Sequence, residues 1–274
     1  MAIIFALVVV GRFRETARLY LSFTWGISMR TRRMFLVQSA LTLVTAVSAR
    51  ADDSWEALLK DAIGEANPIT LGRIIPPPSS PLWEEAQGHL DEARKGLRPY
   101  DIARYFVTSL PPEFQIAWPE PNPARPTLAN PVIVLFFAST KTQPAGDTTP
   151  WCSAFVNWCL QNSSPAIPGT NSAASQSFVR NAGWGTEVWN KKDSWPPTAA
   201  RRGDIAVFTN KSDPAHGHVA FFERATPRQP HHVDVLGGNQ FNRDREHTFN
   251  VKSLNIKNEL ELVSIRTTRG LRDG

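Results

Sequence analysis

The sequence predicts an α+β protein in which helices come first and a meandering antiparallel sheet follows. Apolar residues recur at helical spacing in the first half of the chain's body, residues 52–274. In the second half, short alternating segments are separated by Gly, Pro, Asn and Asp. With 274 residues, 42% of them hydrophobic and 20% charged, the chain can form a packed core, and it has no internal repeat.

The positive charge of the chain is concentrated at its N-terminal end. The full sequence has a net charge of +5 and a pI near 9.5, values that by themselves suggest nucleic-acid binding. Residues 1–51, however, hold seven Arg and one acidic residue, so the body has a net charge of −1. The body also has no run of Lys and Arg with interleaved aromatic residues, and we expect no nucleic-acid partner.

The N-terminal charge belongs to a predicted export signal at residues 29–51. A basic segment opens it, an apolar stretch follows at 34–47, and residues 49–51 (ARA) fit a signal-peptidase site. The run TRRMFL at 31–36 resembles a twin-arginine signal. We therefore expect twin-arginine or general export machinery and signal peptidase as partners. The mature chain would begin at Asp52 and be periplasmic or extracellular.

Residues 1–28 do not fit such a signal, because their apolar run at 2–10 is too short to span a membrane. The favoured interpretation is that translation starts at Met29 and that residues 1–28 are a mis-called start. The alternative is a membrane anchor built from both apolar stretches. Polar residues interrupt the stretch at 34–47, which argues against a retained span of about 20 apolar residues.

The first half of the body is expected to be helical. The predicted helices are 53–65, a segment opened by Ser80 and Pro81 that ends near Lys95, and 100–110. We interpret 52–110 as a small helical region and the proline-rich 111–129 as a linker on the surface. The segment 130–137 is ambiguous, because its β-branched residues suggest a strand while its Asn-Pro start suggests a helix.

A further helix should begin at Pro150 and run to about Gln161. Five strands are expected after it, at 203–209, 217–223, 232–236, 249–254 and 260–266.

Cys152 lies at the start of the helix that Pro150 opens. Unpaired backbone N–H groups and the helix dipole at that position favour a thiolate and can hold an oxyanion. Cys159 lies two turns further along the same helix, roughly 10 Å away by helical rise. A disulfide needs Cα atoms within about 7 Å, so the two cannot bond, and we interpret Cys159 as a core residue.

His218 follows Gly217 at the head of a predicted strand and is the candidate base. If the next strand pairs with this one, Asn239 comes near the imidazole and can orient it. His216, His218, His231 and His232 also invite a metal interpretation. Their spacing does not fit one face of a helix or a strand, so we expect no metal site and no cofactor.

Four motifs carry a resemblance to a known family. They are DTTPWCSAFVNWCL at 147–160, GDIAVF at 203–208, GHV at 217–219 and LGGNQ at 236–240. In order and spacing they resemble CHAP domains, the cysteine, histidine-dependent amidohydrolases/peptidases, and are most similar to a small bacterial branch with a WCxxFVNWC motif. The similarity covers 130–268, which we interpret as a CHAP-like cysteine hydrolase domain.

The resemblance implies a papain-like α+β fold and hydrolysis of peptidoglycan amide bonds. It makes Cys152 the nucleophile, His218 the base and Asn239 the orienting residue. Many CHAP domains have an acidic residue where this chain has Gly237, so the orienting role falls on Asn239 alone. Asp234 and Asp213 are the alternatives should Asn239 lie too far from the ring.

Three further residues flank these positions and are expected to bind substrate: Trp151, Gly217 and Gln240. The expected protein is a monomeric peptidoglycan amidase or endopeptidase. Two alternatives stay open: a catalytically silent CHAP-fold module that binds the wall or serves a structural role, and a metallohydrolase. The sequence does not distinguish which amide bond is cut.

Overall fold

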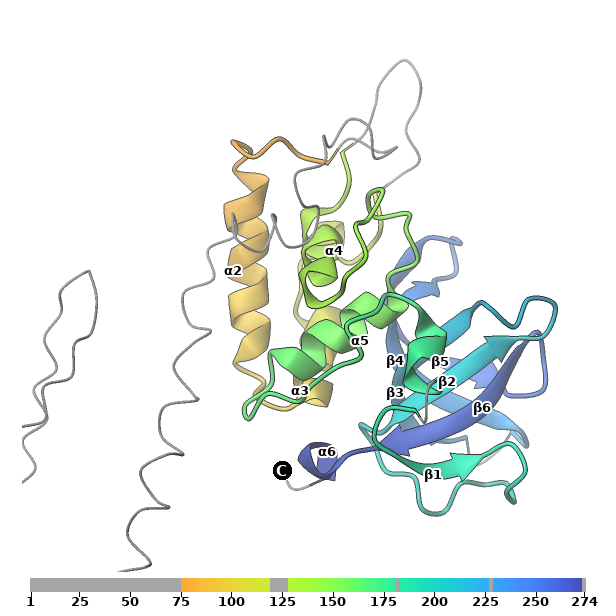
Figure 1. Ribbon diagram of the computed structural model, residues 1–274. Helices are drawn as coiled ribbons and strands as arrows, with labels where there is room; N and C mark the ends of the chain where they lie inside the picture. The colour runs from red at the N-terminus through yellow and green to blue at the C-terminus, as the bar shows by residue number, and fades with distance from the viewer. Residues whose placement is uncertain (1–74, 119–127, 181–182, 227–228, 273–274) are drawn as a thin grey trace, which may run out of the picture. The chain divides into compact units, whose positions relative to one another are not determined.

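The computed structural model of the protein describes residues 75–118, 128–180, 183–226 and 229–272 (Figure 1). All of them belong to the unit Val47–Gly274. The predicted export signal and the predicted helix at 53–65 lie outside the described residues. Within the described part of the chain, no helix is long and apolar enough to cross a membrane.

Helices precede a sheet, which confirms the predicted α+β class. The α-helices are α2 (Leu82–Arg94), α3 (Pro99–Thr108), α4 (Pro131–Phe136), α5 (Cys152–Gln161) and α6 (Arg269–Arg272). Short 3-10 helices are η2 (Pro112–Phe114), η3 (Phe137–Ser139) and η4 (Ser175–Phe178). The strands are β1 (Thr186–Asn190), β2 (Ile205–Asn210), β3 (Gly217–Ala225), β4 (His232–Phe241), β5 (His247–Asn255) and β6 (Leu260–Thr267).

The ambiguous segment at 130–137 is helical because Asn130 caps it. The Asn130 side-chain oxygen accepts a hydrogen bond from the backbone N–H of Val132 at 3.0 Å, and Pro131 occupies the first helical position. The Asn130 amide nitrogen donates to the carbonyls of Phe114 and Ile116. One buried side chain therefore starts α4 and also fixes the chain that precedes it.

Within the described residues, helix α3 of the predicted helical region packs into the core that the sheet also uses. The Phe106 ring of α3 lies within 5.7 Å, centroid to centroid, of the rings of Phe136, Phe155, Trp158 and Phe249. These rings come from α4, α5 and β5, so helices and sheet share one hydrophobic core. Aromatic side chains contribute large buried areas, and α3 is therefore part of the domain's core.

The described part of the predicted linker, 111–118, is attached to the sheet. Its Phe114 is buried, and Ile116 forms an antiparallel bridge with Thr248 of β5. The Ala117 N–H donates to the carbonyl of His247 at 2.8 Å. We call residues 111–118 the strap, because they tie the helices to the outer edge of β5.

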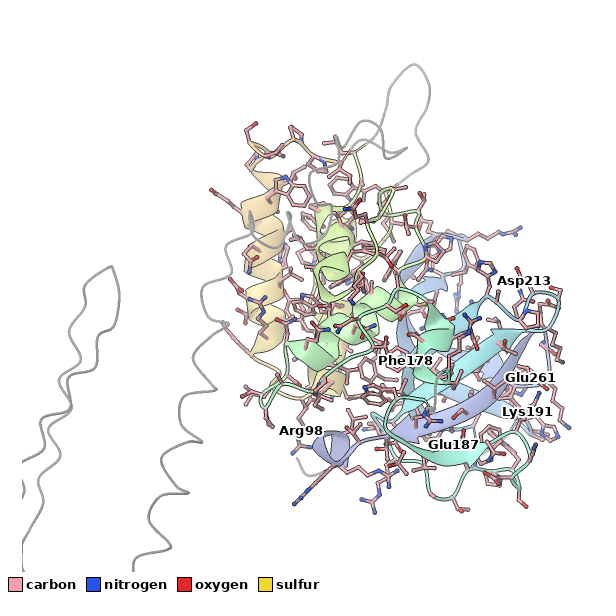
Figure 2. The ribbon with its side chains drawn as sticks, in the orientation of Figure 1. Arg98, Phe178, Glu187, Lys191, Asp213 and Glu261 are labelled. Atoms are coloured by element: carbon pink, nitrogen blue, oxygen red, sulfur yellow. The ribbon has the colours of Figure 1, made fainter. Side chains whose placement is uncertain are left out.

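The sheet has six strands in the order β1-β6-β2-β3-β4-β5, with antiparallel neighbours throughout. Helix α5 packs on β3 and β4, as the ribbon in Figure 1 shows. Strand β1 was not predicted from the sequence. It pairs with β6 at the other edge, where Lys191 beside its end forms an ion pair with Glu261 at 3.1 Å (Figure 2).

Candidate active site

Cys152 is the first residue of α5, with Trp151 as the N-cap. The thiol is buried, with 3% of the residue exposed. Burial raises its pKa, whereas hydrogen bonds from the backbone N–H groups of Val219, Ser153 and Cys152 itself act in the opposite direction. The helix start therefore favours the thiolate as expected, but burial outweighs it, and the resting side chain is a protonated thiol.

Helix α5 packs on β3, the strand that bears His218. Val219 directly follows His218 on this strand, and its backbone N–H is one of the groups that lower the pKa of Cys152. Among the described residues, no hydrogen bond joins the Cys152 thiol to the His218 ring. The structure thus packs the helix that begins at Cys152 on the strand that bears His218, without a direct hydrogen bond between the two side chains.

His218 is the second residue of β3 and has 7% of its surface exposed. Burial, together with the positive charge of Lys252, lowers the pKa of His218 to about 4. The ring is therefore neutral at pH 7 and can accept a proton. Its Nε2 atom is buried and has no hydrogen-bond partner among the described residues.

A cavity of about 160 Å³ opens at this histidine. It brings together four of the residues expected at the site from two strands: Gly217 and His218 of β3, Asn239 and Gln240 of β4. The remaining lining residues are Phe241, Lys252, Leu254 and Leu260. Cys152 and Trp151 are not among the residues that line it.

Asn239 lies in a bulge of β4. The register with β5 shifts between Gly237 and Gln240, and Asn239 has a left-handed backbone with φ of 60°. No hydrogen bond involves its side chain within the described residues, and the residue is partly exposed. The structure therefore places Asn239 in the same cavity as His218 without a hydrogen bond to the ring.

Trp151 has no exposed surface, so its expected contact with substrate is replaced by a packing role. Its indole lies 4.8 Å from the Phe249 ring, centroid to centroid. It also covers Gly238, where an added Cβ would stand 2.1 Å from the Trp151 ring. Trp151 thus holds the start of α5 against the bulge of β4.

Gly217 is required by close packing. A Cβ at this residue would lie 2.0 Å from the carbonyl oxygen of Phe208 and 2.5 Å from the amide nitrogen of Gln176. Gln176 belongs to η4 and donates to that same carbonyl at 2.7 Å. Gln176 therefore ties η4 to the strand beside His218, a role that the sequence did not suggest because its neighbours carry no recognisable motif.

The other motif residues hold the fold together. Asp147 is buried and accepts hydrogen bonds from the backbone N–H groups of Trp118 and Asn130. Asp204 is buried, accepts from the backbone N–H of Arg201, and forms an ion pair with Arg272 at 2.7 Å. These two aspartates in the motifs therefore have a structural role, because they hold distant segments of the chain together.

The alternative orienting residues have other partners. Asp234 forms an ion pair with Arg224 at 2.8 Å, and Asp213 contacts His216 at 2.7 Å in an exposed turn. Cys159 is free and fully buried, and burial raises the pKa of its thiol well above the usual value. These observations agree with Cys152 as the more accessible of two thiols.

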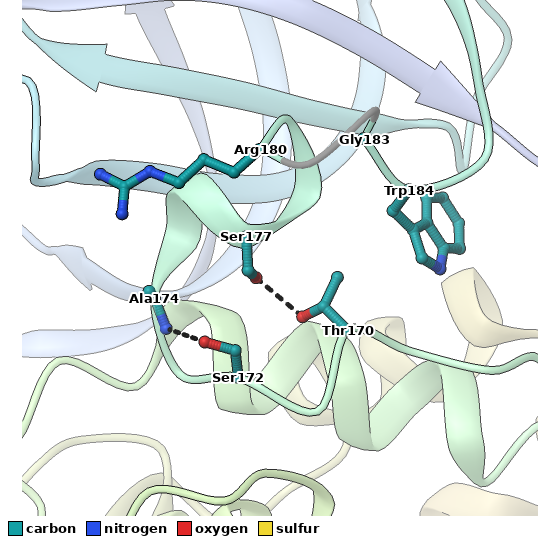
Figure 3. Close-up of a pocket in the computed structure, with 7 residues that line it drawn as sticks. All are labelled: Thr170, Ser172, Ala174, Ser177, Arg180, Gly183 and Trp184. Carbon is teal, nitrogen blue, oxygen red and sulfur yellow. Dashed lines mark hydrogen bonds between the residues drawn. The ribbon is translucent and has the colours of Figure 1, made fainter.

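A larger pocket, of about 470 Å³, is lined by residues of η4 and of the segments that flank it (Figure 3). Ser177 and Thr170 share a hydrogen bond of 2.7 Å across it, and Ser172 accepts one from the N–H of Ala174. The pocket also includes Arg180 and Trp184. None of the expected site residues lines it, so the smaller cavity at His218 is the better candidate for chemistry.

The search against family models matches residues 144–239 to the CHAP domain. The comparison with curated proteins and the comparison with solved structures give no match. The matched segment contains Cys152, His218 and Asn239, and its helix-then-sheet arrangement agrees with the α+β CHAP fold. On this match and this fold, the chain contains a domain of the CHAP family.

Proposed function

We propose that this protein is a cysteine-dependent amidase or endopeptidase that cleaves amide bonds in peptidoglycan. The observation that carries the proposal is the packing of α5, which begins at Cys152, on β3, the strand that bears His218. CHAP domains are generally amidohydrolases that depend on a cysteine and a histidine, and the chain contains such a domain.

The reaction divides into two steps. The Cys152 sulfur attacks the amide carbonyl while its proton passes to His218, and the C–N bond then breaks as His218 protonates the leaving amine. Water next attacks the resulting thioester and gives up a proton to His218. The carboxylic acid is released, and the proton returns to the Cys152 sulfur. Backbone N–H groups at the start of α5 offer donors for the oxyanion.

The neutral pair fits this sequence of proton transfers. With a raised thiol pKa and a lowered imidazole pKa, both groups are uncharged at rest. Proton transfer then accompanies attack on the bound substrate. The same burial favours the second candidate, a catalytically silent module that binds the wall, because a protonated thiol is a weak nucleophile.

A pair of serine variants separates the two functions. Cys152→Ser should abolish the release of soluble fragments from purified peptidoglycan. Mass spectrometry measures this release in the wild type and the variant, and it also identifies the bond that is cut. Cys159→Ser is the matched control: it should keep most activity and lose about 1–3 kcal/mol of stability if its hydroxyl is unpaired in the core. Release of fragments by neither the wild type nor Cys152→Ser would favour the silent module.

We also propose that the chain is exported and acts as a periplasmic or extracellular monomer. The predicted signal at 29–51 supports this proposal. Expression from Met29 should yield a mature protein that starts at Asp52, as measured by N-terminal sequencing. Replacing Arg32 and Arg33 by Lys should retain the precursor in the cytoplasm. When the full chain is expressed, a mature protein that still carries residues 1–28 would contradict the assignment.

A further inference from the structure

The cavity at His218 contains one charged side chain besides the candidate base, Lys252 of β5, within the described residues. The residues that β4 and β6 contribute to the lining are neutral. The charge of Lys252 acts on the ring, since it is the second cause, after burial, that lowers the pKa of His218. A charge that acts on the base also acts on any group that binds next to the base.

The Lys252 side chain lies on the inner face of the sheet. Lys252 is paired with Val235 of β4, and directly opposite residues on antiparallel strands lie on the same face. Val235 is fully buried in a hydrophobic cluster with Phe208. The Lys252 Nζ atom donates to the backbone carbonyl of Phe241, the last residue of β4, at 2.9 Å. The apolar stem thus lies along the sheet, and the ammonium group is placed at the end of β4, beside the cavity.

The Lys252 ammonium group has no acidic partner within the described chain. It has three N–H donors, and the Phe241 carbonyl accepts from one of them. The other two have no protein partner among the described residues. The residue is half-buried, and a partly buried charge is stabilised by an opposite charge next to it. A bound anion would supply that charge.

The cavity limits the kind of anion that fits. Its volume of about 160 Å³ is smaller than the roughly 300–1,000 Å³ of a typical ligand pocket, so it fits one end or one side chain of a substrate and no disaccharide. Phe241 also lines it and is 48% exposed, so an apolar group beside the anion can pack on the ring. A carboxylate with a small apolar neighbour, as in an amino acid, meets both conditions.

We propose that Lys252 binds a free carboxylate of the substrate next to the amide bond that is cleaved. The preferred substrate is then a wall peptide in which an amino acid with a free carboxylate flanks that bond. The inference rests on the proposed function and names the group by which the enzyme selects a bond. The bound carboxylate would also offset the charge of Lys252 at the ring, so that substrate binding makes His218 a stronger base.

Two small probes test the binding without turnover: N-acetyl-alanine and N-acetyl-alanine amide, which differ only in the carboxylate. In ¹⁵N NMR titrations of the purified protein, the acid should bind about tenfold more tightly than the amide and shift the Gly217 and Phe241 signals. Lys252→Met should remove this preference, whereas Lys252→Arg, which keeps the charge, should keep it. Equal binding of the two probes to the wild type, or binding of neither, would overturn the inference, even if the Lys252 variants do not fold.

Lys211→Met is the matched control. Lys211 also donates from Nζ to a backbone carbonyl, that of Lys257, and it does not line the cavity. This substitution removes the same charge and the same kind of hydrogen bond, so the preference for the acid should stay. If Lys252 only supports the end of β4, Lys252→Met should weaken the binding of both probes equally. An equal loss of preference in Lys211→Met would overturn the assignment to Lys252.

The pKa of the His218 ring gives a second measurement, with its NMR signal assigned from a His218→Gln variant. Lys252→Met should raise this pKa towards the ordinary value of 6.5, because one of the two causes that lower it is removed. Saturation with N-acetyl-alanine should raise it in the wild type and leave it unchanged in Lys252→Met. An unchanged pKa in the saturated wild type would contradict a carboxylate beside the ring.

Turnover distinguishes failure of this inference from failure of the proposed function. Soluble wall fragments whose free carboxylates have been converted to amides should be cleaved by the wild type with a kcat/KM about tenfold lower than untreated fragments. Lys252→Met should show little difference between them. Equal cleavage of both by an active wild type would refute the role of Lys252 alone. Cleavage of neither, with a preference for the acid probe that depends on Lys252, would refute the hydrolase alone.

Discussion

The neutral, buried ring of His218 should make the protein sensitive to mild acid. The pKa of this residue is about 4 in the folded chain against an ordinary value of 6.5. A depressed pKa means that the unfolded chain binds the proton first, so stability is full above pH 6.5 and falls as the pH drops towards 4. Between pH 7 and pH 5 this linkage amounts to ~2 kcal/mol of unfolding free energy.

Urea denaturation of wild type and His218→Gln at pH 7, 6 and 5 tests this value. The variant has no ionisable group at position 218, so its free energy of unfolding should fall by ~2 kcal/mol less than that of the wild type over the same interval. Carboxylates whose pKa is lowered, such as Asp234, contribute mainly below this window. Identical pH dependence of the two proteins would refute the buried, neutral histidine.

Two further substitutions test the packing that positions the site. Phe106→Ala should lower stability by about 3–5 kcal/mol, because it opens a cavity between α3 and the rings of α4, α5 and β5. The midpoint of urea denaturation measures this loss. A loss no larger than that of Val251→Ala, at an exposed residue, would contradict the shared core. Gly238→Ala should lower the free energy of unfolding by about 1–3 kcal/mol and impair activity, because the added methyl group meets the Trp151 ring. Gly88→Ala has open space around it and should stabilise α2 by up to about 1 kcal/mol. Equal effects of the two substitutions would refute the Trp151 contact.

The sequence predicted the elements whose local signals are strong. The starts of α2 and α5, each close to a proline, lie within a residue or two of their expected positions, and five of the six strands were expected. The missed strand, β1, is short and has an irregular register with β6, so its sequence has no clean alternation. Its position at the sheet edge depends on pairing with a distant segment, which local patterns do not report.

The candidate site shows the same division. Motif positions predicted that Gly217, His218, Asn239 and Gln240 converge, and they line one cavity. What each side chain does there depends on burial and on the β4 bulge. Both are tertiary features, which local sequence patterns do not report.

The strap at 111–118 makes the unit that folds larger than the segment that family comparison identifies. The match ends at residue 239, before β5 begins, and it starts after α4 has ended. An expression fragment cut to 144–239 would lack β5 and β6, the partners of β4 and β2, and would lack Phe106. A fragment that starts at 130 would keep the sheet but expose the edge of β5 that Ile116 and Ala117 cover in the full domain. Exposed edge strands tend to pair with strands of other chains. Protein engineering of this scaffold should therefore treat α2, α3 and the strap as part of the unit that must fold together.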